Sequence, residues 1–174
     1  YLSLPVGYSK QLLLNAIVND LIIRLIVDEN NDRYVIDEIS ETPVEHWNGY
    51  AEYHVNLDRT INSYTVTNAM GMSVTAYAAD DLSRYGLLQD DPVGTYLLYG
   101  GSEMENLARY KLQKIMGQRK KMTCIRNLTD IHDMPAMINS CWIVGSEKYR
   151  IESVSIVGSV AKYGGYKLEE IHVR

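Results

Sequence analysis

The sequence contains no phenylalanine, although it contains 14 tyrosines. A buried tyrosine needs a hydrogen-bond partner for its hydroxyl group, which makes a complete replacement of phenylalanine by tyrosine physically unfavourable. Many of the tyrosines nevertheless stand at positions whose neighbours place them in a hydrophobic core. These are Tyr96, Tyr99, Tyr110, Tyr149, Tyr163 and Tyr166.

Cysteine is scarce, with only Cys124 and Cys141 in the chain. Two cysteines exclude a disulfide framework of the kind that holds small secreted domains together. Each has apolar neighbours in the sequence, which indicates buried thiols and favours a reducing compartment.

Positive charge is also in short supply, because 17 Lys and Arg stand against 22 Asp and Glu. The resulting net charge of −5 argues against a general nucleic-acid binder, which is basic overall or carries a basic face. We therefore expect no specific nucleic-acid partner.

The chain lacks a hydrophobic run long enough to cross a membrane. Its most apolar stretch, residues 12–27, includes Asp20 and Arg24, and each charge costs about 3 kcal/mol at the centre of a bilayer. Pro5 and Gly7 interrupt any apolar core of a secretory leader, and no basic residues precede them. We expect neither a membrane partner nor a leader in this sequence.

What is present is an ordinary globular composition, with 46% apolar residues in a chain of 174. A chain of this size buries about 70% of its unfolded surface and folds without metal or disulfide links. The prediction is a single domain over residues 1–174, with an alternative subdomain boundary near Gly100-Gly101.

Strand signals dominate the pattern of apolar residues. A short helix is expected at 10–18, with Ser9 as its N-cap, and an amphipathic helix at 103–116, with a capping box of Ser102 and Glu105. Residues 43–49 are expected to form a loop. Strands are expected at 21–27, 34–39, 50–57, 62–78 with a bulge or turn at Gly71, 95–99, 142–144, 149–157 and 166–173. This order predicts an α+β fold, mainly antiparallel β and sandwich- or barrel-like, because regular βαβ alternation is absent.

The most enzyme-like segment is Thr129 to Asp133. On a strand, Asp130 and His132 share a face and could begin a metal site or an acid/base pair, with Asp133 beside them. The alternative interpretation is a polar loop before Pro135, in which these side chains bond turn amides. We favour the loop because no other His or Cys has recognisable ligand spacing.

Other charged or glycine-rich segments also have ordinary interpretations. Asp80-Asp81 and Asp90-Asp91 could bind a divalent cation, but acids before Leu82 and Pro92 are typical of helix starts and turns. Arg119-Lys120-Lys121 could contact phosphates, but it also lies where positive charge suits the end of a helix. The Gly-Gly pairs match no phosphate-binding loop.

An interface role rests on two features. Trp47 and Tyr50 flank an Asn-Gly loop, where exposed aromatic side chains would anchor a partner. Packing of Trp47 in the core is at least as good an interpretation. The predicted C-terminal strand, which carries Leu168, Ile171 and Val173, could add to the sheet of a neighbouring subunit.

Residues 9–57 contain in succession a helix with Leu12-Leu13-Leu14, the strand 21–27, an Asp/Asn-rich turn, an acidic stretch at 37–41, and Asn48-Gly49-Tyr50-Ala51. In this succession the first third of the chain resembles a class of tailed-bacteriophage virion structural proteins. The sequence departs from that class at Asn31-Asp32, where Thr-Pro is usual, and in an acidic stretch that lacks its aromatic residue. The resemblance implies a non-enzymatic subunit of a symmetric particle.

The sequence thus predicts a structural or assembly subunit of a phage particle, in the capsid, neck or tail, without a cofactor. Its expected partners are other virion subunits and further copies of itself, and its expected location is the virion. Two alternatives remain: a small metal-dependent hydrolase centred on Asp130, His132 and Asp133, and an adaptor domain of a cytoplasmic complex.

Overall fold

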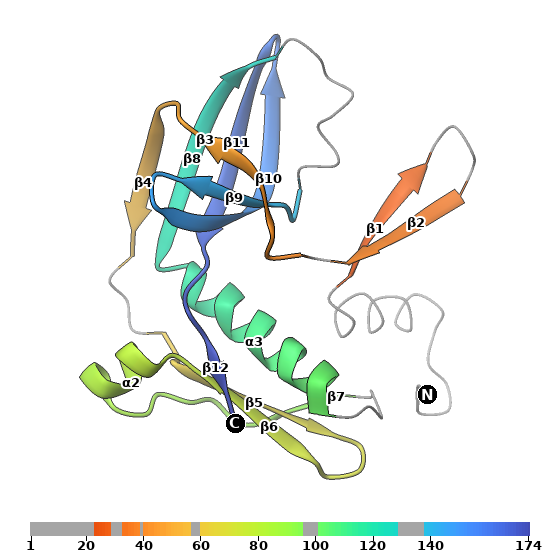
Figure 1. Cartoon of the computed structure of the whole chain (residues 1–174), viewed down its shortest axis with the longest axis vertical. Helices are drawn as coiled ribbons and strands as arrows, with labels where there is room; N and C mark the ends of the chain where they lie inside the picture. The colour runs from red at the N-terminus through yellow and green to blue at the C-terminus, as the bar shows by residue number, and fades with distance from the viewer. Residues whose placement is uncertain (1–22, 29–32, 39, 57–59, 96–100, 129–137) are drawn as a thin grey trace. The chain divides into compact units, whose positions relative to one another are not determined.

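The structure is a computed structural model, and it describes residues 23–28, 33–38, 40–56, 60–95, 101–128 and 138–174. The chain divides into two compact units (Figure 1). Unit 1 consists of Tyr1–Glu38, Thr60–Ile115 and Glu170–Arg174, and unit 2 of Ile39–Arg59 and Met116–Glu169. The predicted helix at 10–18 lies outside the described residues, as does part of the predicted subdomain boundary.

Unit 2 is built on a six-stranded sheet whose order is β3-β9-β10-β11-β8-β4. All neighbours pair antiparallel except β3 and β9, which are parallel. The strands are β3 (Pro43–Trp47), β4 (Ala51–Val55), β8 (Lys120–Asn127), β9 (Cys141–Val144), β10 (Glu147–Val157) and β11 (Val160–Lys167). Two tight turns, at Gly145 and Gly158, connect β9 to β10 and β10 to β11, and both glycines have positive φ.

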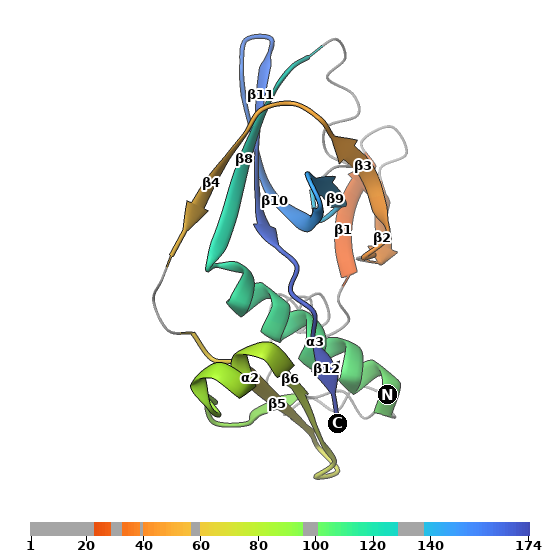
Figure 2. The ribbon, with the colours of Figure 1, turned by 60° about the vertical axis from the view of Figure 1, so that its left-hand side comes forward.

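The two outer strands of this sheet, β3 and β4, are consecutive in the sequence and are joined by only three residues, 48–50. In a flat six-stranded sheet the outer strands would lie roughly 24 Å apart, whereas this connection spans at most about 14 Å. The sheet therefore has to curl, and Figure 2 shows β3 and β4 leaving the same turn. These two strands are not hydrogen-bonded neighbours among the described elements, so the curled sheet stays open.

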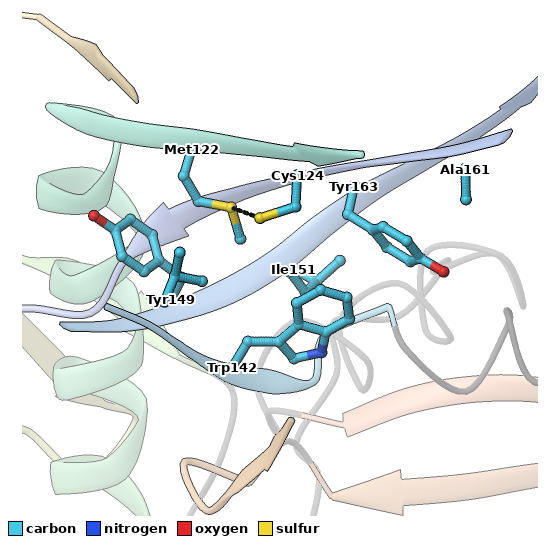
Figure 3. Packing of buried hydrophobic residues seen from close by; sticks show 8 residues of the cluster. Met122, Cys124, Trp142, Tyr149, Ile151, Ala161 and Tyr163 are labelled. Carbon is cyan, nitrogen blue, oxygen red and sulfur yellow. Dashed lines mark hydrogen bonds between the residues drawn. The ribbon is translucent and has the colours of Figure 1, made fainter. Parts of the chain in front are cut away.

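The core of unit 2 fills the inner face of the curled sheet (Figure 3). The Trp142 and Tyr163 rings pack at a tilt of 45° with their centroids 4.8 Å apart, and the Sγ of Cys124 lies 3.3 Å from the Sδ of Met122. The other buried members are Val144, Tyr149, Ile151 and Ala161. The predicted burial of Tyr149, Tyr163, Tyr166 and both cysteines is confirmed, while Tyr110 is half-buried.

Unit 1 contains a four-stranded sheet with the order β12-β6-β5-β7 and a separate hairpin. Its strands are β5 (Ser63–Asn68), β6 (Ser73–Tyr77), β7 (Val93–Thr95) and β12 (His172–Val173). The hairpin pairs β1 (Ile23–Asp28) with β2 (Arg33–Glu38), which confirms the predicted strand pair. The predicted turn at Gly71 is also confirmed, with φ at 81°.

Two helices belong to this part of the chain: α2 (Ala79–Tyr85) and α3 (Gly101–Gly117). Helix α3 confirms the predicted amphipathic helix, because Met104, Leu107, Ala108, Leu112 and Met116 are buried. Its start differs from the prediction, since the helix already includes Gly101. Ser102 is therefore no N-cap, and its hydroxyl donates to the Glu103 carboxylate at 3.0 Å.

Gly117 ends α3 for a reason that the sequence pattern does not reveal. A Cβ atom at this position would lie 2.2 Å from the Tyr166 ring and 2.9 Å from the Lys167 carbonyl oxygen. Glycine is required here by the close approach of β11, and not by a left-handed backbone.

Several predicted elements are wrong, and each error involves pairing between distant segments. Residues 43–49 were expected to form a loop, but Pro43–Trp47 form β3, an edge strand that begins with proline, where the missing N–H is tolerated. The segment predicted as one strand over 166–173 is split between β11 and β12, which lie in different sheets. The interpretation of Asp80-Asp81 as a helix start is confirmed, because both acids lie in the first turn of α2, a helix that buries no side chain. Lys120 and Lys121 were expected at the end of a helix, but they begin the strand β8.

Strand β4 confirms the predicted strand at 50–57 but not its buried face. In this strand Tyr53 and Val55 alternate with Glu52 and His54, which is typical of a half-buried strand, but Tyr53 and Val55 are 47% and 62% exposed. Both faces of β4, an outer strand of the sheet, are therefore largely exposed.

The tight packing of the sheet in unit 2 predicts a cost for any side chain at Gly165. A Cβ atom there would lie 2.7 Å from the Arg150 carbonyl oxygen and 3.1 Å from the Met122 methyl group. We expect Gly165→Ala to lower the free energy of unfolding by about 1–3 kcal/mol, measured by urea denaturation.

Gly94→Ala is the matched control for this substitution. Gly94 also lies in a strand, but no atom lies within 4 Å of a Cβ built on it. The control should change the free energy of unfolding by less than about 0.5 kcal/mol. Equal destabilisation by the two substitutions would contradict the packing argument.

Candidate functional site

The turn that joins β3 to β4 presents the most exposed of the predicted interface residues. Tyr50 is 73% exposed, whereas its predicted companion Trp47 is half-buried and stacks on Trp142 with ring centroids 5.9 Å apart. The indole Nε1 of Trp47 donates a hydrogen bond to the Tyr50 carbonyl oxygen at 3.1 Å. Trp47 thus fixes the turn, and Tyr50 is the side chain that the turn displays.

Two further contacts hold Trp47 in place. The Arg126 guanidinium lies over the Trp47 ring at 5.1 Å and over the Trp142 ring at 5.6 Å, and it bonds the Glu45 carboxylate at 2.9 Å. A Cβ atom on Gly49 would come within 2.7 Å of the Trp47 ring, so the turn requires glycine. The turn is therefore rigid before any partner binds.

The predicted C-terminal interface residues occupy different environments from those expected. Leu168 and Ile171 are buried within the chain, and Val173 is half-buried. β12 pairs with β6, with His172 opposite Tyr77 and Val173 opposite Ala76. Of the five predicted interface residues, only Tyr50 is exposed, and a role in an interface stays a prediction for all five.

Two turns in unit 1 also display apolar side chains that sequence reasoning did not single out as interface candidates. In the first, between β5 and β6, Met70 is 78% exposed. The turn is locked by the buried Asn68, whose Oδ1 accepts hydrogen bonds from the N–H groups of Met70 and Met72, both at 3.0 Å. Asn68 also donates its own N–H to the Met72 carbonyl oxygen at 2.9 Å.

The second turn follows α2 and displays Leu87, which is 58% exposed. It is locked by the fully buried Asn62, whose Nδ2 donates to the Gly86 carbonyl oxygen at 2.7 Å and whose Oδ1 accepts from Leu88 N–H at 2.9 Å. Asn68 stands two residues before Met70, a spacing at which asparagine side chains commonly bond turn amides, and this was the available signal for the first turn. Asn62 lies 24 residues before Gly86, so the second turn had no local signal.

The densest group of charges in unit 2 surrounds Glu147, at the start of β10. Its carboxylate accepts hydrogen bonds from Lys120 on β8, from Tyr149 at 2.8 Å, and from Lys167 on β11 at 3.0 Å. Glu169 contacts the same Lys167 ammonium at 3.3 Å. These contacts tie three strands together, so the group is built to hold the sheet.

The electrostatics of this group follow from burial and from those hydrogen bonds. Burial raises the pKa of Glu147, but the hydrogen bonds from Lys120, Lys167 and Tyr149 outweigh it and lower the pKa to about 2. Burial also raises the pKa of the Tyr149 hydroxyl, and the adjacent Glu147 carboxylate raises it further. Tyr149 therefore stays protonated and donates to Glu147.

The thiols are not reactive groups in this structure. Burial raises the pKa of Cys124 to about 11, although Arg126 opposes the change, and burial raises the pKa of Cys141 as well. Both side chains are buried, as their apolar neighbours predicted.

The remaining predicted sites lie in helix turns, exposed segments or ion pairs, or outside the described residues. Asp80 and Asp81 lie in the first turn of α2, Asp90 and Asp91 lie in an exposed segment before β7, and Lys120 and Lys121 form ion pairs with Glu147 and Glu152. Asp130, His132 and Asp133 lie outside the described residues. In the described ranges, no group of three or more His, Cys, Asp or Glu is placed to hold a metal ion, and no helix is long and apolar enough to span a membrane.

The lowered pKa of Glu147 predicts a pH-dependent contribution to stability. A carboxyl group whose pKa is lower in the folded chain stabilises the fold above its unfolded pKa, and this effect is lost as the pH falls toward the folded value. We expect Glu147→Gln to lower the free energy of unfolding by roughly 1–2 kcal/mol at pH 7. The difference from the unmodified chain should shrink between about pH 4.5 and pH 2.

Glu152→Gln is the control, because Glu152 has a single ionic partner, Lys121, at 3.1 Å. Its effect in the same urea titrations should stay below about 0.5 kcal/mol at every pH. A Glu147→Gln effect that is absent at pH 7, or unchanged down to pH 3, would contradict the assignment.

Comparison with known proteins identifies similarity in structure only. No protein-family model and no curated protein matches the sequence. Among solved structures, the chain is similar to a protein in the virion of a native gene transfer agent particle, with a TM-score of 0.60 and 12% identity over 95% of this chain. It is also similar to the 43 kDa tail protein of prophage MuSo2 from Shewanella oneidensis, with a TM-score of 0.56 and 14% identity over 94% of this chain.

A third similar structure is the prophage tail protein gp18 from Listeria monocytogenes EGD-e, with a TM-score of 0.55 and 11% identity over 94% of this chain. The chain spans 40%, 56% and 54% of the lengths of these three proteins, respectively. The resemblance to tailed-phage virion proteins, which the sequence suggested over residues 9–57, is thus confirmed for the fold. The chain shares that fold over nearly its whole length with proteins of phage tails and of a phage-like particle.

Proposed function

We propose that this chain is a structural subunit of the tail of a phage or phage-like particle and that it acts through protein interfaces. The observation that carries the proposal is the similarity over 94% of the chain to two prophage tail proteins from different bacteria. The match to a protein in the virion of a gene transfer agent supports a place in the particle. Tail is favoured over capsid and neck because both prophage structures are described as tail proteins.

The exposed turns give this proposal a mechanism. Tyr50, Met70 and Leu87 are large apolar side chains on backbone that is already fixed by Trp47, Asn68 and Asn62. Binding through a rigid turn avoids the entropy cost of ordering a flexible loop. Exposed aromatic and methionine side chains are typical anchors of protein interfaces. We infer that these turns contact neighbouring subunits, which include further copies of the chain.

The location can be tested on purified particles. An antibody raised against the 174-residue chain should label tails in electron micrographs, and mass spectrometry of isolated tails should recover the chain. Labelling of heads, or recovery of the chain only in the particle-free fraction, would reject the tail assignment.

The role of the turns can be tested by substitution at Met70. Met70→Ser removes the anchor from a locked turn, so we expect fewer assembled particles while the free energy of unfolding changes by less than about 0.5 kcal/mol. Ala69→Ser, next to it in the same exposed turn, is the control and should leave particle yield unchanged. Normal assembly with Met70→Ser would exclude this turn from the interface.

A further inference from the structure

Strand β4 has an open edge whose hydrogen-bonding groups can be identified. The Asn56 N–H donates to the Arg119 carbonyl oxygen at 2.7 Å, which continues the antiparallel ladder between β4 and β8. In such a ladder, the N–H and C=O of one residue point to the same side, and the side alternates along the strand. The N–H group of Asn56 points toward β8, so the N–H and C=O groups of His54 and Glu52 point toward β8 as well.

It follows that the N–H and C=O groups of Ala51, Tyr53 and Val55 point away from β8. Of the described strands, only β8 pairs with β4. The side chains of Tyr53 and Val55 are also 47% and 62% exposed. β4 also lacks proline, lysine and a bulge, the features with which edge strands commonly prevent pairing with other chains.

The sequence of β4, Ala-Glu-Tyr-His-Val, is complementary to itself when the strand is paired antiparallel with a second copy. With Tyr53 opposite Tyr53 of the second copy, Ala51 lies opposite Val55, and Glu52 lies opposite His54. Tyr53, Ala51 and Val55 are the residues with outward N–H and C=O groups, so all three would exchange main-chain hydrogen bonds.

The charge pattern selects this register over its neighbours. Glu52 and His54 form the pairs without main-chain bonds, in which the Cα atoms lie only about 4.5 Å apart and side chains interact most strongly. A shift by one step in one permitted direction would place Glu52 against Glu52, and like charges directly opposite each other are destabilising. A shift in the other direction would place His54 against His54 and leave Glu52 without its imidazole partner. Either shift would lose main-chain bonds.

We propose that β4 is a self-association site, through which two copies of the chain join their six-stranded sheets around a twofold axis at Tyr53. The occupant of the open edge is β4 of the second copy, and the Glu52–His54 pairs set the register. This inference goes beyond the tail assignment, and the two can fail separately, since one is tested in solution and the other on particles.

The experiment is sedimentation equilibrium of the 174-residue chain, from low micromolar concentration to about 500 µM. We expect a monomer–dimer equilibrium in the micromolar range, because one strand pair is a small interface. In the His54→Glu variant, Glu52 of each copy would lie opposite a glutamate of the other copy. We expect the dissociation constant of the dimer to rise by about tenfold or more. The double variant Glu52→His with His54→Glu restores opposite pairs and should return the dissociation constant to within about threefold of the original.

A second pair of variants tests the main-chain bonds. Val55→Pro removes an outward N–H and should abolish dimerisation, whereas Val55→Thr keeps that N–H and should not. A monomer at every concentration, a trimer or larger species, a swap variant as weak as His54→Glu, or a dimer unaffected by Val55→Pro would each overturn the proposal. Should Val55→Pro fail to fold, the exposed Glu52 and His54 variants decide the question alone.

Discussion

The short connection between β3 and β4 is the constraint on which the rest of unit 2 depends. Three residues join the two outer strands of a six-stranded sheet, so the sheet cannot be flat. The curl brings Glu45 on β3 within 2.9 Å of Arg126 on β8, although four positions separate these strands in the sheet order. The same curl lets Trp47 stack on Trp142 and closes one side of the core.

The curled sheet provides a hydrogen-bond partner for a tyrosine hydroxyl in its core. Tyr149 belongs to the buried core and still satisfies its hydroxyl group by donating to Glu147 at 2.8 Å. Glu147 in turn requires Lys120 and Lys167 to remain charged at a partly buried position. The buried Tyr149 thus requires an ionic group beside it, and this group of Glu147, Lys120 and Lys167 connects β8, β10 and β11.

The surfaces available for assembly follow from what the core leaves exposed. Each of the turns at Tyr50, Met70 and Leu87 is fixed from beneath by one polar group, namely the Trp47 indole or the amides of Asn68 and Asn62. β4 is left as an open edge because the curl stops short of closure. A subunit of a repeating particle needs rigid contact points of this kind, whose position is set before binding.

The sequence by itself determined the local elements. The amphipathic helix of α3, the hairpin of β1 and β2, the turn at Gly71 and the burial of Cys124 and Cys141 all follow from periodicity and neighbouring residues. Only the tertiary structure decided which strands are neighbours. β3 pairs with a strand that begins almost a hundred positions later, and residues 168–171 carry the chain from one sheet to another. Such pairings depend on contacts between segments that are distant in the sequence, and these contacts do not alter the pattern of apolar residues within a short segment. For that reason the exposure of Tyr53 and Val55 could not be predicted from the alternation of apolar and polar residues.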